Sequence, residues 1–219
     1  MRTVLLPGLG ETPVGKILGI GTNYAAHAME MGSPIGGDPV VFLKPSTALC
    51  FDGAVVRPPG PGHEMHHEVE LVVAIGKTGY RIPFEKALGH VAAYAVGLDM
   101  TLRDLQLVAK QKGRPWALAK GFDTSAPVSA FRSAAEVGDP QDIPLTLMIN
   151  GQLRQSGSSS DMIVPVAGLI CFVSQYVTLE PGDLIFTGTP AGVGPLQAGD
   201  VLQAEAVGVG RLGVSVGSP

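Results

Sequence analysis

The sequence predicts a mainly β protein with short helices, an α+β fold, on three observations. Of the 219 residues, 30 are glycine and 18 are proline, and these residues disfavour helix interiors by roughly 1 and 3 kcal/mol each. Hydrophobic residues make up 45% of the chain and charged residues 16%, which supplies a folded core. Apolar runs of strand length recur between the glycines and prolines without a repeat period. These observations exclude a helical bundle, a coiled coil and a disordered chain.

The length and the lack of a linker-like stretch predict one domain that spans residues 1–219. A chain of this size buries enough surface to hold a core without disulfides or structural metals. Its glycine- and serine-rich stretches, residues 32–37 and 157–160, are too short for a linker. We expect residues 1–15 to form an N-terminal extension or edge strand and residues 16–216 to form the core.

The first half of the chain is predicted to alternate short strands with short helices. Strands are expected at residues 16–21, 39–43, 68–75 and 91–100, and a hairpin at 49–56 around Asp52-Gly53. Helices are expected at residues 24–31, 83–90 and 101–112. Asn23 can cap the first of these helices, and Pro83 suits the start of the second.

The second half is predicted to contain more strands than helices. Residues 113–127 are predicted to form a loop, and residues 164–176 an apolar helix. Strands are expected at residues 145–149, 183–187, 201–207 and 212–216. Asn150-Gly151 is typical of a type I′ hairpin turn after the first of these strands.

Charge and hydropathy favour a small molecule as the binding partner. The formal net charge is −4 and no cluster of lysine and arginine is present, whereas nucleic acids and anionic membranes require a basic surface. The longest apolar stretch, residues 163–173, is far shorter than the ~20 residues that span a bilayer. We therefore expect a cytoplasmic protein without nucleic-acid or membrane partners. Cys50 and Cys171 lack metal-site spacing and are predicted to be buried, inert thiols.

Three short motif matches are rejected because their structural context is wrong. His63–His67 fits the zinc-protease pattern HExxH, but PPGPG precedes it and a strand pattern follows, so it cannot lie on a helix. Gly208–Gly213 fits GxGxxG, yet too few residues follow it to form a dinucleotide-binding unit. Gly76-Lys77-Thr78 lacks the earlier glycine of a phosphate loop.

Three acids form a candidate metal site. Glu68 and Glu70 are two apart on a predicted strand, so their carboxylates project from the same face about 6.5 Å apart. Asp99 stands alone at the end of another apolar strand. Three carboxylates without a thiolate suit a hard ion such as Mg²⁺ or Mn²⁺, and the remaining positions can take two oxygens of a 2-oxo acid. Spacing alone leaves open a solvated strand face, the commoner arrangement of such acids.

A histidine and a glutamate form a candidate acid–base pair. His27 and Glu30 are three apart on a short helix, so they share a face, and the glutamate can fix the tautomer of a catalytic histidine. The glycine-rich segment that follows is typical of a lid. Lys120, Arg103 and Gln106 lie near the acids in sequence, but as single residues they are ordinarily expected on the surface.

Several segments together resemble the fumarylacetoacetate hydrolase family over nearly the whole chain. In order, they are GTNYAAHAMEMG, VVFLKPSTAL, HHEVELVVAIGK, GLDMTLRDLQ, GRPWALAKGFD, INGQLRQSGSSSDMI and LEPGDLIFTGTPAGVGP. The combination of ExE on a strand, DxTxRDxQ and GTPxGVG is highly specific, and the short length resembles the acylpyruvate hydrolase and oxaloacetate decarboxylase branch. Ala26 departs from the acid that many members carry in an NYADH segment.

The resemblance implies a fold, a set of partners and a set of residue roles. The implied fold is a mixed β-sandwich roll forming a single catalytic domain, usually a homodimer. Mg²⁺, with Mn²⁺ possible as a replacement, would be held by Glu68, Glu70 and Asp99. The catalytic residues would be His27 and Glu30, on a closing lid, and Lys120. The substrate would be bound by Arg103, Gln106 and Thr189.

The resulting functional hypothesis is hydrolytic carbon–carbon cleavage of a 2,4-dioxo acid such as fumarylpyruvate or acetylpyruvate. His27 with Glu30 would activate water, and pyruvate enolate would leave, stabilised by the metal and Lys120. Decarboxylation or keto–enol tautomerisation of oxaloacetate is the nearest alternative, because enolate stabilisation is common to all three reactions. An isomerase or hydratase of aromatic catabolism is a further alternative. From a different class, a non-catalytic metal- or ligand-binding protein would retain the metal site without turnover.

Overall fold

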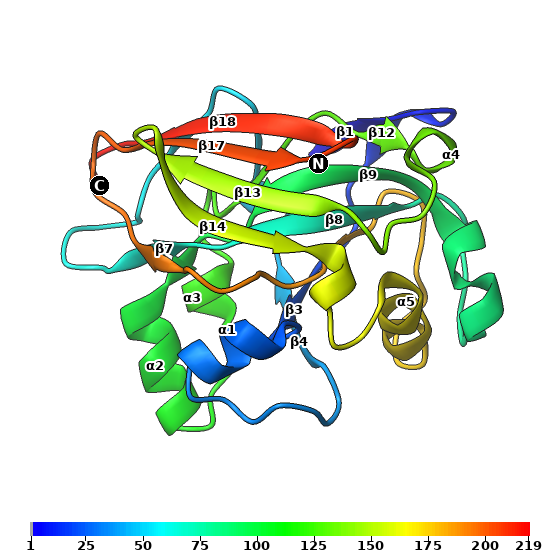
Figure 1. The fold of residues 1–219 in the computed structure, drawn as a ribbon, viewed down its shortest axis with the longest axis horizontal. Helices are drawn as coiled ribbons and strands as arrows, with labels where there is room; N and C mark the ends of the chain where they lie inside the picture. Colours follow the sequence, from blue (N-terminus) through cyan, green and yellow to red (C-terminus); the bar gives the residue numbers. More distant parts are fainter. Residues whose placement is uncertain (1) are drawn as a thin grey trace.

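Two β-sheets that face each other form the body of the molecule in a computed structural model, which describes residues 2–219 (Figure 1). The larger sheet has eight strands in the order β4-β3-β15-β8-β9-β11-β5, with β12 beside β9. Its strands are β3 (Ile17–Gly21), β4 (Val40–Lys44), β5 (Leu49–Phe51), β8 (Val69–Ile75), β9 (Val91–Leu98), β11 (Ala126–Val128), β12 (Arg132–Ser133) and β15 (Leu184–Phe186).

The second sheet has five strands, and two smaller sheets complete the β structure. The five-stranded sheet consists, in spatial order, of β14 (Gln152–Ser158), β13 (Pro144–Ile149), β17 (Val201–Ala206), β18 (Gly210–Val216) and β6 (Val55–Val56). The smaller sheets are β10 (Thr101–Leu102), β7 (Met65–His67) and β16 (Gly194–Pro195), and the pair β1 (Thr3–Leu6) and β2 (Gly10–Pro13). Because Met65–His67 is a strand, the rejection of the zinc-protease motif is confirmed.

Short helices surround the sheets. They are α1 (Ala25–Glu30), α2 (Arg103–Gln111), α3 (Ala117–Lys120), α4 (Ala134–Val137), α5 (Val166–Ser174) and the 3₁₀ segments η1 (Ser46–Ala48), η2 (Phe84–His90) and η3 (Ser159–Asp161). Figure 1 shows α1, α2 and α3 grouped at one side of the sheets, with α5 apart from them. Within residues 2–219, every helix is too short or too polar to cross a membrane.

The core fills the space on both faces of β8, whose seven residues are all buried. One apolar cluster lies between the two sheets and contains Leu71 and Val73 from β8 together with Leu147 from β13. The other cluster lies on the opposite face and contains Val72 with residues of the β1–β2 hairpin. Burial of each large aliphatic side chain contributes about 1.5–3 kcal/mol, so β8 is a rigid base for the groups at its start.

The prediction of a mainly β fold with short helices is confirmed, and the type I′ turn is found where expected. Asn150 and Gly151 have φ values of 51° and 77° and join β13 to β14. The predicted helix at residues 101–112 begins only at Arg103, because Thr101 and Leu102 pair with β7 as strand β10.

Two predictions of secondary structure are wrong. Residues 49–56 do not pair as a hairpin: β5 joins β11 in the large sheet and β6 joins β18 in the small one. The chain turns at Asp52-Gly53, but the Asp52 carboxylate and the Gly53 N–H bind Gly213 instead of closing a two-stranded ladder. Residues 113–127 are not all loop, because the helix-forming sequence ALAK forms α3 and a short parallel strand, β11, follows.

Candidate active site

Three buried carboxylates meet at the start of β8 and the end of β9. One oxygen from each of Glu68, Glu70 and Asp99 lies within 4.8 Å of the others. The antiparallel register sets Val69 opposite Leu98, and the N–H of Asp99 donates to the carbonyl of Glu68 at 2.8 Å. The three acids that the sequence singled out are therefore brought together, and their burial excludes a solvated strand face.

The three carboxylates differ in their cationic partners. Glu68 accepts from Arg103 Nη2 at 2.6 Å and from Lys120 Nζ at 2.8 Å. Burial alone would raise the pKa of Glu68, but the charges of Lys120 and Arg103 outweigh it and hold that pKa well below its usual range. Among the described residues, Glu70 accepts a hydrogen bond only from the backbone N–H of Gly188, at 2.8 Å. Burial, followed by the neighbouring charges of Asp99 and Glu68, raises the pKa of Glu70 well above its ordinary value.

The unequal distribution of cationic partners among the three carboxylates fits a divalent cation. Within residues 2–219, Glu70 has no lysine, arginine or histidine in ion-pair contact, although it is buried beside two other acids. A buried carboxylate without a charge partner costs several kcal/mol. The donor set consists only of carboxylate oxygens, which suit Mg²⁺ or Mn²⁺. The residues present therefore fit a hard metal ion.

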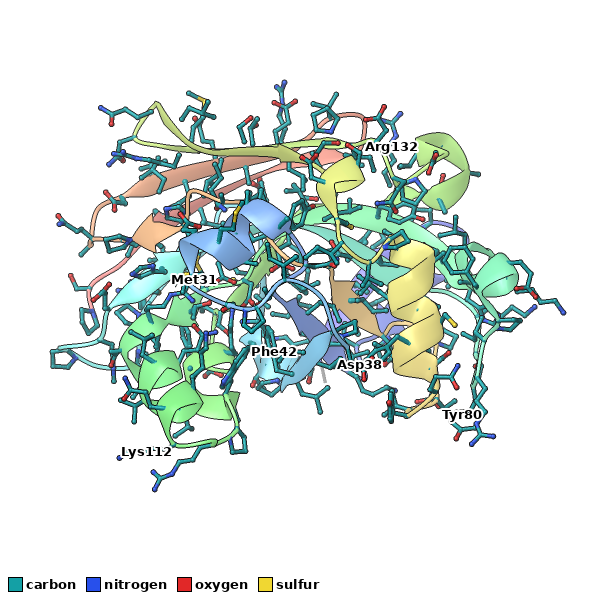
Figure 2. All side chains as sticks on the ribbon, turned by 60° about the horizontal axis from the view of Figure 1, so that its bottom comes forward. Met31, Asp38, Phe42, Tyr80, Lys112 and Arg132 are labelled. Atoms are coloured by element: carbon teal, nitrogen blue, oxygen red, sulfur yellow. The ribbon has the colours of Figure 1, made fainter. Side chains whose placement is uncertain are left out.

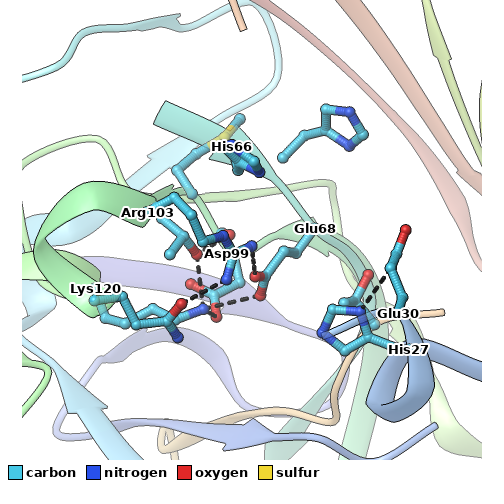
Figure 3. Close-up of polar contacts among 12 residues, drawn as sticks. His27, Glu30, His66, Glu68, Asp99, Arg103 and Lys120 are labelled. Atoms are coloured by element: carbon cyan, nitrogen blue, oxygen red, sulfur yellow. Dashed lines mark hydrogen bonds and ion pairs between the residues drawn. The ribbon is translucent and has the colours of Figure 1, made fainter. Parts of the chain in front are cut away.

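Lys120 lies inside the carboxylate cluster (Figure 3). Its ammonium is 2.8 Å from Glu68 Oε2 and 2.5 Å from Asp99 Oδ2, and it donates to Thr101 Oγ1 at 2.7 Å. Burial alone would lower the pKa of Lys120, but Asp99 and Glu68 raise it, so the side chain remains a cation. The one-turn helix α3 ends at this residue and directs it inward.

Lys44 is a second buried ammonium that sequence reasoning missed. Its Nζ is 2.7 Å from Asp99 Oδ1 and donates to the backbone carbonyls of Lys120, Met100 and Ser125. Lys44 ends β4, a strand in which Phe42 is also buried while Leu43 between them is exposed. The period-two pattern Phe42-Leu43-Lys44 is the signal that could have placed this lysine on the inner face.

His27 and Glu30 form a pair on α1, beside the acids. His27 Nδ1 is 3.1 Å from Glu30 Oε2, and Glu30 accepts a second hydrogen bond from the backbone N–H of Gly192. His27 is buried, with 6% of its surface exposed. Asn23 does not cap α1 as predicted, because Tyr24 is the N-cap residue and no side chain makes a cap hydrogen bond. The Asn23 side chain instead donates to the Val164 carbonyl and accepts from the Val164 N–H, which ties the start of α1 to that segment. The predicted pair is thus present, and Nδ1 is committed to Glu30.

Arg103 and Gln106 extend from one face of α2 into the site. Arg103 Nη1 donates to Gln106 Oε1 at 2.5 Å while its Nη2 binds Glu68. Both side chains are buried despite their polarity. The spacing of three residues places them on the same helical face.

Thr189 lies at the opposite wall, in the segment after β15. Its hydroxyl donates to the carbonyl of Val69 at 2.8 Å and accepts from Gln155 Nε2 at 2.8 Å. Gln155 Oε1 also accepts from the N–H of Val69 and contacts His67 Nδ1 at 3.0 Å. Gln155 was not predicted. The only sequence signal for Gln155 was that a polar side chain stands at an inward position of a hairpin strand. Its role becomes visible only when β14 packs against the site.

A small cavity of about 30 Å³ connects these groups. It is lined by Ile20, Gly21, Thr22, His27, Met31, Ser33, Glu68, Arg103, Gln106, Lys110, Trp116, Lys120 and Thr189. Six of the nine predicted site residues line this cavity, and Glu30 and Asp99 each contact a residue that lines it. The ninth, Glu70, belongs to the site through the carboxylate cluster. A cavity with an acid–base pair and a place for a divalent ion defines an enzyme-type site.

Comparison with known proteins identifies the family of this chain. Residues 16–217 match the family model described as fumarylacetoacetate (FAA) hydrolase C-terminal. Oxaloacetate tautomerase FAHD1 of Mus musculus is 49% identical over 194 residues, covering 89% of this chain and 88% of the relative. Oxaloacetate tautomerase YcgM of Escherichia coli K12 is 48% identical over 193 residues, covering 88% of each. The chain therefore belongs to the fumarylacetoacetate hydrolase family.

A solved structure supports the same assignment. Fumarylpyruvate hydrolase from Pseudomonas aeruginosa, in complex with Mn²⁺ and pyruvate, matches with a TM-score of 0.95 and 40% identity. The match covers 100% of this chain and 96% of that chain. The expected fold of the family is thereby confirmed for this chain.

Proposed function

We propose that this chain is a divalent-metal-dependent enzyme of 2-oxo acids and that its reaction is keto–enol tautomerisation of oxaloacetate. The observation that supports metal dependence is Glu70, a buried acid beside two others and without a cationic partner. The choice of reaction is supported by two relatives, 49% and 48% identical, that are named oxaloacetate tautomerases. Fumarylpyruvate hydrolase, the structural relative, binds Mn²⁺ and pyruvate, itself a 2-oxo acid.

The three acids, the His27–Glu30 pair and Lys120 have distinct tasks in this reaction. One Mg²⁺ or Mn²⁺ ion held by Glu68, Glu70 and Asp99 would supply Lewis-acid stabilisation of charge on the 2-oxo group. His27, whose Nδ1 binds Glu30, retains Nε2 to remove the proton from C3. The Lys120 ammonium donates a hydrogen bond to the former carbonyl oxygen as it gains charge. That oxygen takes its proton from water, and His27 releases the C3 proton to water, so both residues regain their starting protonation. One C–H bond breaks and one O–H bond forms, so no atom is lost.

The test follows the decay of enol oxaloacetate by ultraviolet absorbance in chelator-stripped and metal-reloaded protein. We expect activity to vanish with EDTA and to return with Mg²⁺ or Mn²⁺. Glu70→Gln keeps the shape of the side chain but removes its charge, so activity should fall by at least roughly 100-fold without rescue by added metal. Glu64→Gln, at an exposed acid outside the triad, is the matched control and should retain activity. Metal-independent turnover, or a fully active Glu70→Gln variant, would refute the proposal.

A second candidate is hydrolysis of acylpyruvates such as fumarylpyruvate, the first expectation from the sequence. It is favoured by a larger cavity of about 350 Å³ that shares six lining residues with the inner one: Ile20, Gly21, Thr22, Ser33, Lys110 and Trp116. Such a cavity gives room for an acyl tail that oxaloacetate does not have. In this reaction His27 would take a proton from water rather than from carbon. Comparison of kcat/KM on oxaloacetate, acetylpyruvate and fumarylpyruvate decides between the two candidates.

A further inference from the structure

The loop at residues 188–192, which follows β15, touches three parts of the inner site. Its first backbone N–H donates to the triad acid Glu70 at 2.8 Å. Its last N–H donates to Glu30, the partner of the candidate base, at 3.1 Å. Between these two contacts, Thr189 lines the small cavity. We refer to this segment as the threonine loop, and its position controls a metal ligand, the acid–base pair and the ligand space together.

Strand β14 packs directly on the threonine loop. A Cβ on Gly157 would lie 2.6 Å from Pro190 Cβ, and a Cβ on Gly192 would lie 2.3 Å from the carbonyl oxygen of Arg154. Side chains at these two glycines would therefore force the strand and the loop apart. Because β14 is itself paired with β13 along its length, the loop rests on a sheet and not on solvent.

Gln155 fastens β14 to the loop through its side-chain amide. The oxygen accepts from the N–H of Val69 and from His67 Nδ1, both at 3.0 Å. The nitrogen donates to Thr189 Oγ1 at 2.8 Å and to the carbonyl of Pro190 at 2.9 Å. A backbone N–H can only donate and a backbone carbonyl can only accept, so these two partners fix which end of the amide faces the loop. The amide is 1% exposed and uses its two donors and both lone pairs of its oxygen.

The orientation of the amide sets the polarity of the Thr189 hydroxyl. That hydroxyl accepts from Gln155 Nε2, and its single hydrogen is donated to the carbonyl of Val69 at 2.8 Å. A hydroxyl has one hydrogen and two lone pairs, so the lone pair that remains can only accept. Thr189 therefore presents a hydrogen-bond acceptor to the cavity, and the ligand group that suits it is an O–H.

We propose that Gln155 is a positioning residue that holds the Thr189 hydroxyl as the acceptor for the O–H group of an enol substrate. The enol tautomer of oxaloacetate carries a hydroxyl on C2, whereas the keto tautomer has a carbonyl oxygen there and no hydrogen to donate. Lys120 lines the same cavity and supplies a donor, so Lys120 and Thr189 match the acceptor and donor functions of that hydroxyl. The inference rests on the proposed function and makes Thr189 the residue that distinguishes the two tautomers.

The first test measures the decay of enol oxaloacetate in variants of Gln155. Gln155→Met is neutral and of similar length, and it removes the donor to Thr189. Gln155→Glu keeps both acceptor bonds and, assayed at about pH 8 so that its carboxyl group is ionised, also lacks the donor. Each variant should raise KM roughly five- to tenfold and change kcat by less than about twofold, because a contact to the bound enol is lost. Thr189→Val, which lacks the hydroxyl, should give the same result.

Double variants show whether Gln155 acts through Thr189. In the Thr189→Val background, Gln155→Met and Gln155→Glu should each raise KM by less than about twofold further, because the hydroxyl that they misplace is already absent. Calorimetric affinity for Mg²⁺ should stay within about twofold of the wild type in Gln155→Met, since the three acids remain.

Ser174→Ala is the matched control for the loss of a buried hydrogen bond. The Ser174 hydroxyl is buried on α5, where it accepts from the N–H of Ile82 and donates to the carbonyl of Cys171. Figure 2 shows α5 and Tyr80 on the side of the molecule away from Met31, which ends α1. This variant should lower the melting temperature and leave KM unchanged.

The second test compares two ligands that differ at C2 and does not depend on turnover. Lactate has a hydroxyl on C2, and pyruvate has a carbonyl oxygen there. Binding with Mg²⁺ present can be followed by fluorescence, because the chain has 1 tryptophan and Trp116 lines the cavity. Gln155→Met should weaken the binding of lactate roughly five- to tenfold and that of pyruvate by less than about twofold.

Specific results would overturn the inference. A full effect of the Gln155 variants in the Thr189→Val background would show that Gln155 does not act through the hydroxyl. A rise in KM for Gln155→Glu alone would reflect its added charge, and a fall in kcat at unchanged KM would show that Gln155 only maintains the fold. Equal weakening of lactate and pyruvate would exclude recognition of the O–H group. If the wild-type protein did not accelerate enol decay, the proposed function would fail, while the two ligands would still decide the polarity of Thr189.

Discussion

The inner and outer parts of the site are built on different kinds of structure. The inner part sits where β8 and β9 begin and end, and its acids and ammonium groups are buried and joined by ion pairs of 2.5–2.8 Å. The outer part is the larger cavity, which is lined mainly by the segment after α1, the end of β3, Trp116 and the exposed end of α2. Strands over a packed core fix groups that must not move, whereas shorter elements suit a wall that admits different ligands. We therefore expect substitutions in the inner part to abolish turnover, and substitutions in the outer part to alter ligand selectivity.

The largest effect is expected at His27, which extends from α1 into the inner site. His27→Ala should lower kcat by roughly 100- to 10,000-fold, because the acid–base group is lost. Metal affinity, measured by calorimetry, should not change, since the three acids remain. Glu30→Gln should cause a smaller loss of kcat because it removes only the group that orients the ring. A His27→Ala variant with normal kcat would show that proton transfer is performed elsewhere.

Lys44 tests whether the inner part depends on its buried ion pairs. Lys44→Met should lower the free energy of unfolding by about 3 kcal/mol, because Asp99 loses one partner and three backbone carbonyls lose their donor. Chemical denaturation in EDTA measures this loss without a contribution from metal. Lys112→Met, at an exposed site, should change stability by less than about 0.5 kcal/mol. A loss below about 1 kcal/mol for Lys44→Met would mean that Lys120 alone is a sufficient partner for Asp99.

The smallest effect is expected at Gly21, where the two parts meet. In Gly21→Ala the new methyl group would lie 3.1 Å from the Trp116 ring, so the indole must shift by a few tenths of an ångström. We expect a stability loss of about 1 kcal/mol and a change in tryptophan emission. KM should rise more for ligands with a tail than for pyruvate. An equal rise for both would place Trp116 in the inner site rather than at the boundary.

Local patterns in the sequence predicted the elements and the acids because these depend on short-range rules. Glu68 and Glu70 share a face through the two-residue period of a strand, and His27 and Glu30 through the helical period. Lys44 and Gln155 were missed, although the two-residue period at Phe42-Leu43-Lys44 puts Lys44 on the same face as a buried residue. Each is a polar side chain on a strand whose inner face is determined by which distant strand lies beside it. The wrong hairpin at residues 49–56 has the same cause, since its two arms pair with strands far along the chain.

The charges of the inner site have a thermodynamic consequence. When ionised, the three acids are balanced by Lys44, Lys120 and Arg103, which contact two of them. A divalent ion would leave this pocket with two excess positive charges, which a doubly anionic ligand such as oxaloacetate would neutralise. Ion and ligand should therefore bind cooperatively, each increasing the affinity of the other by the same factor.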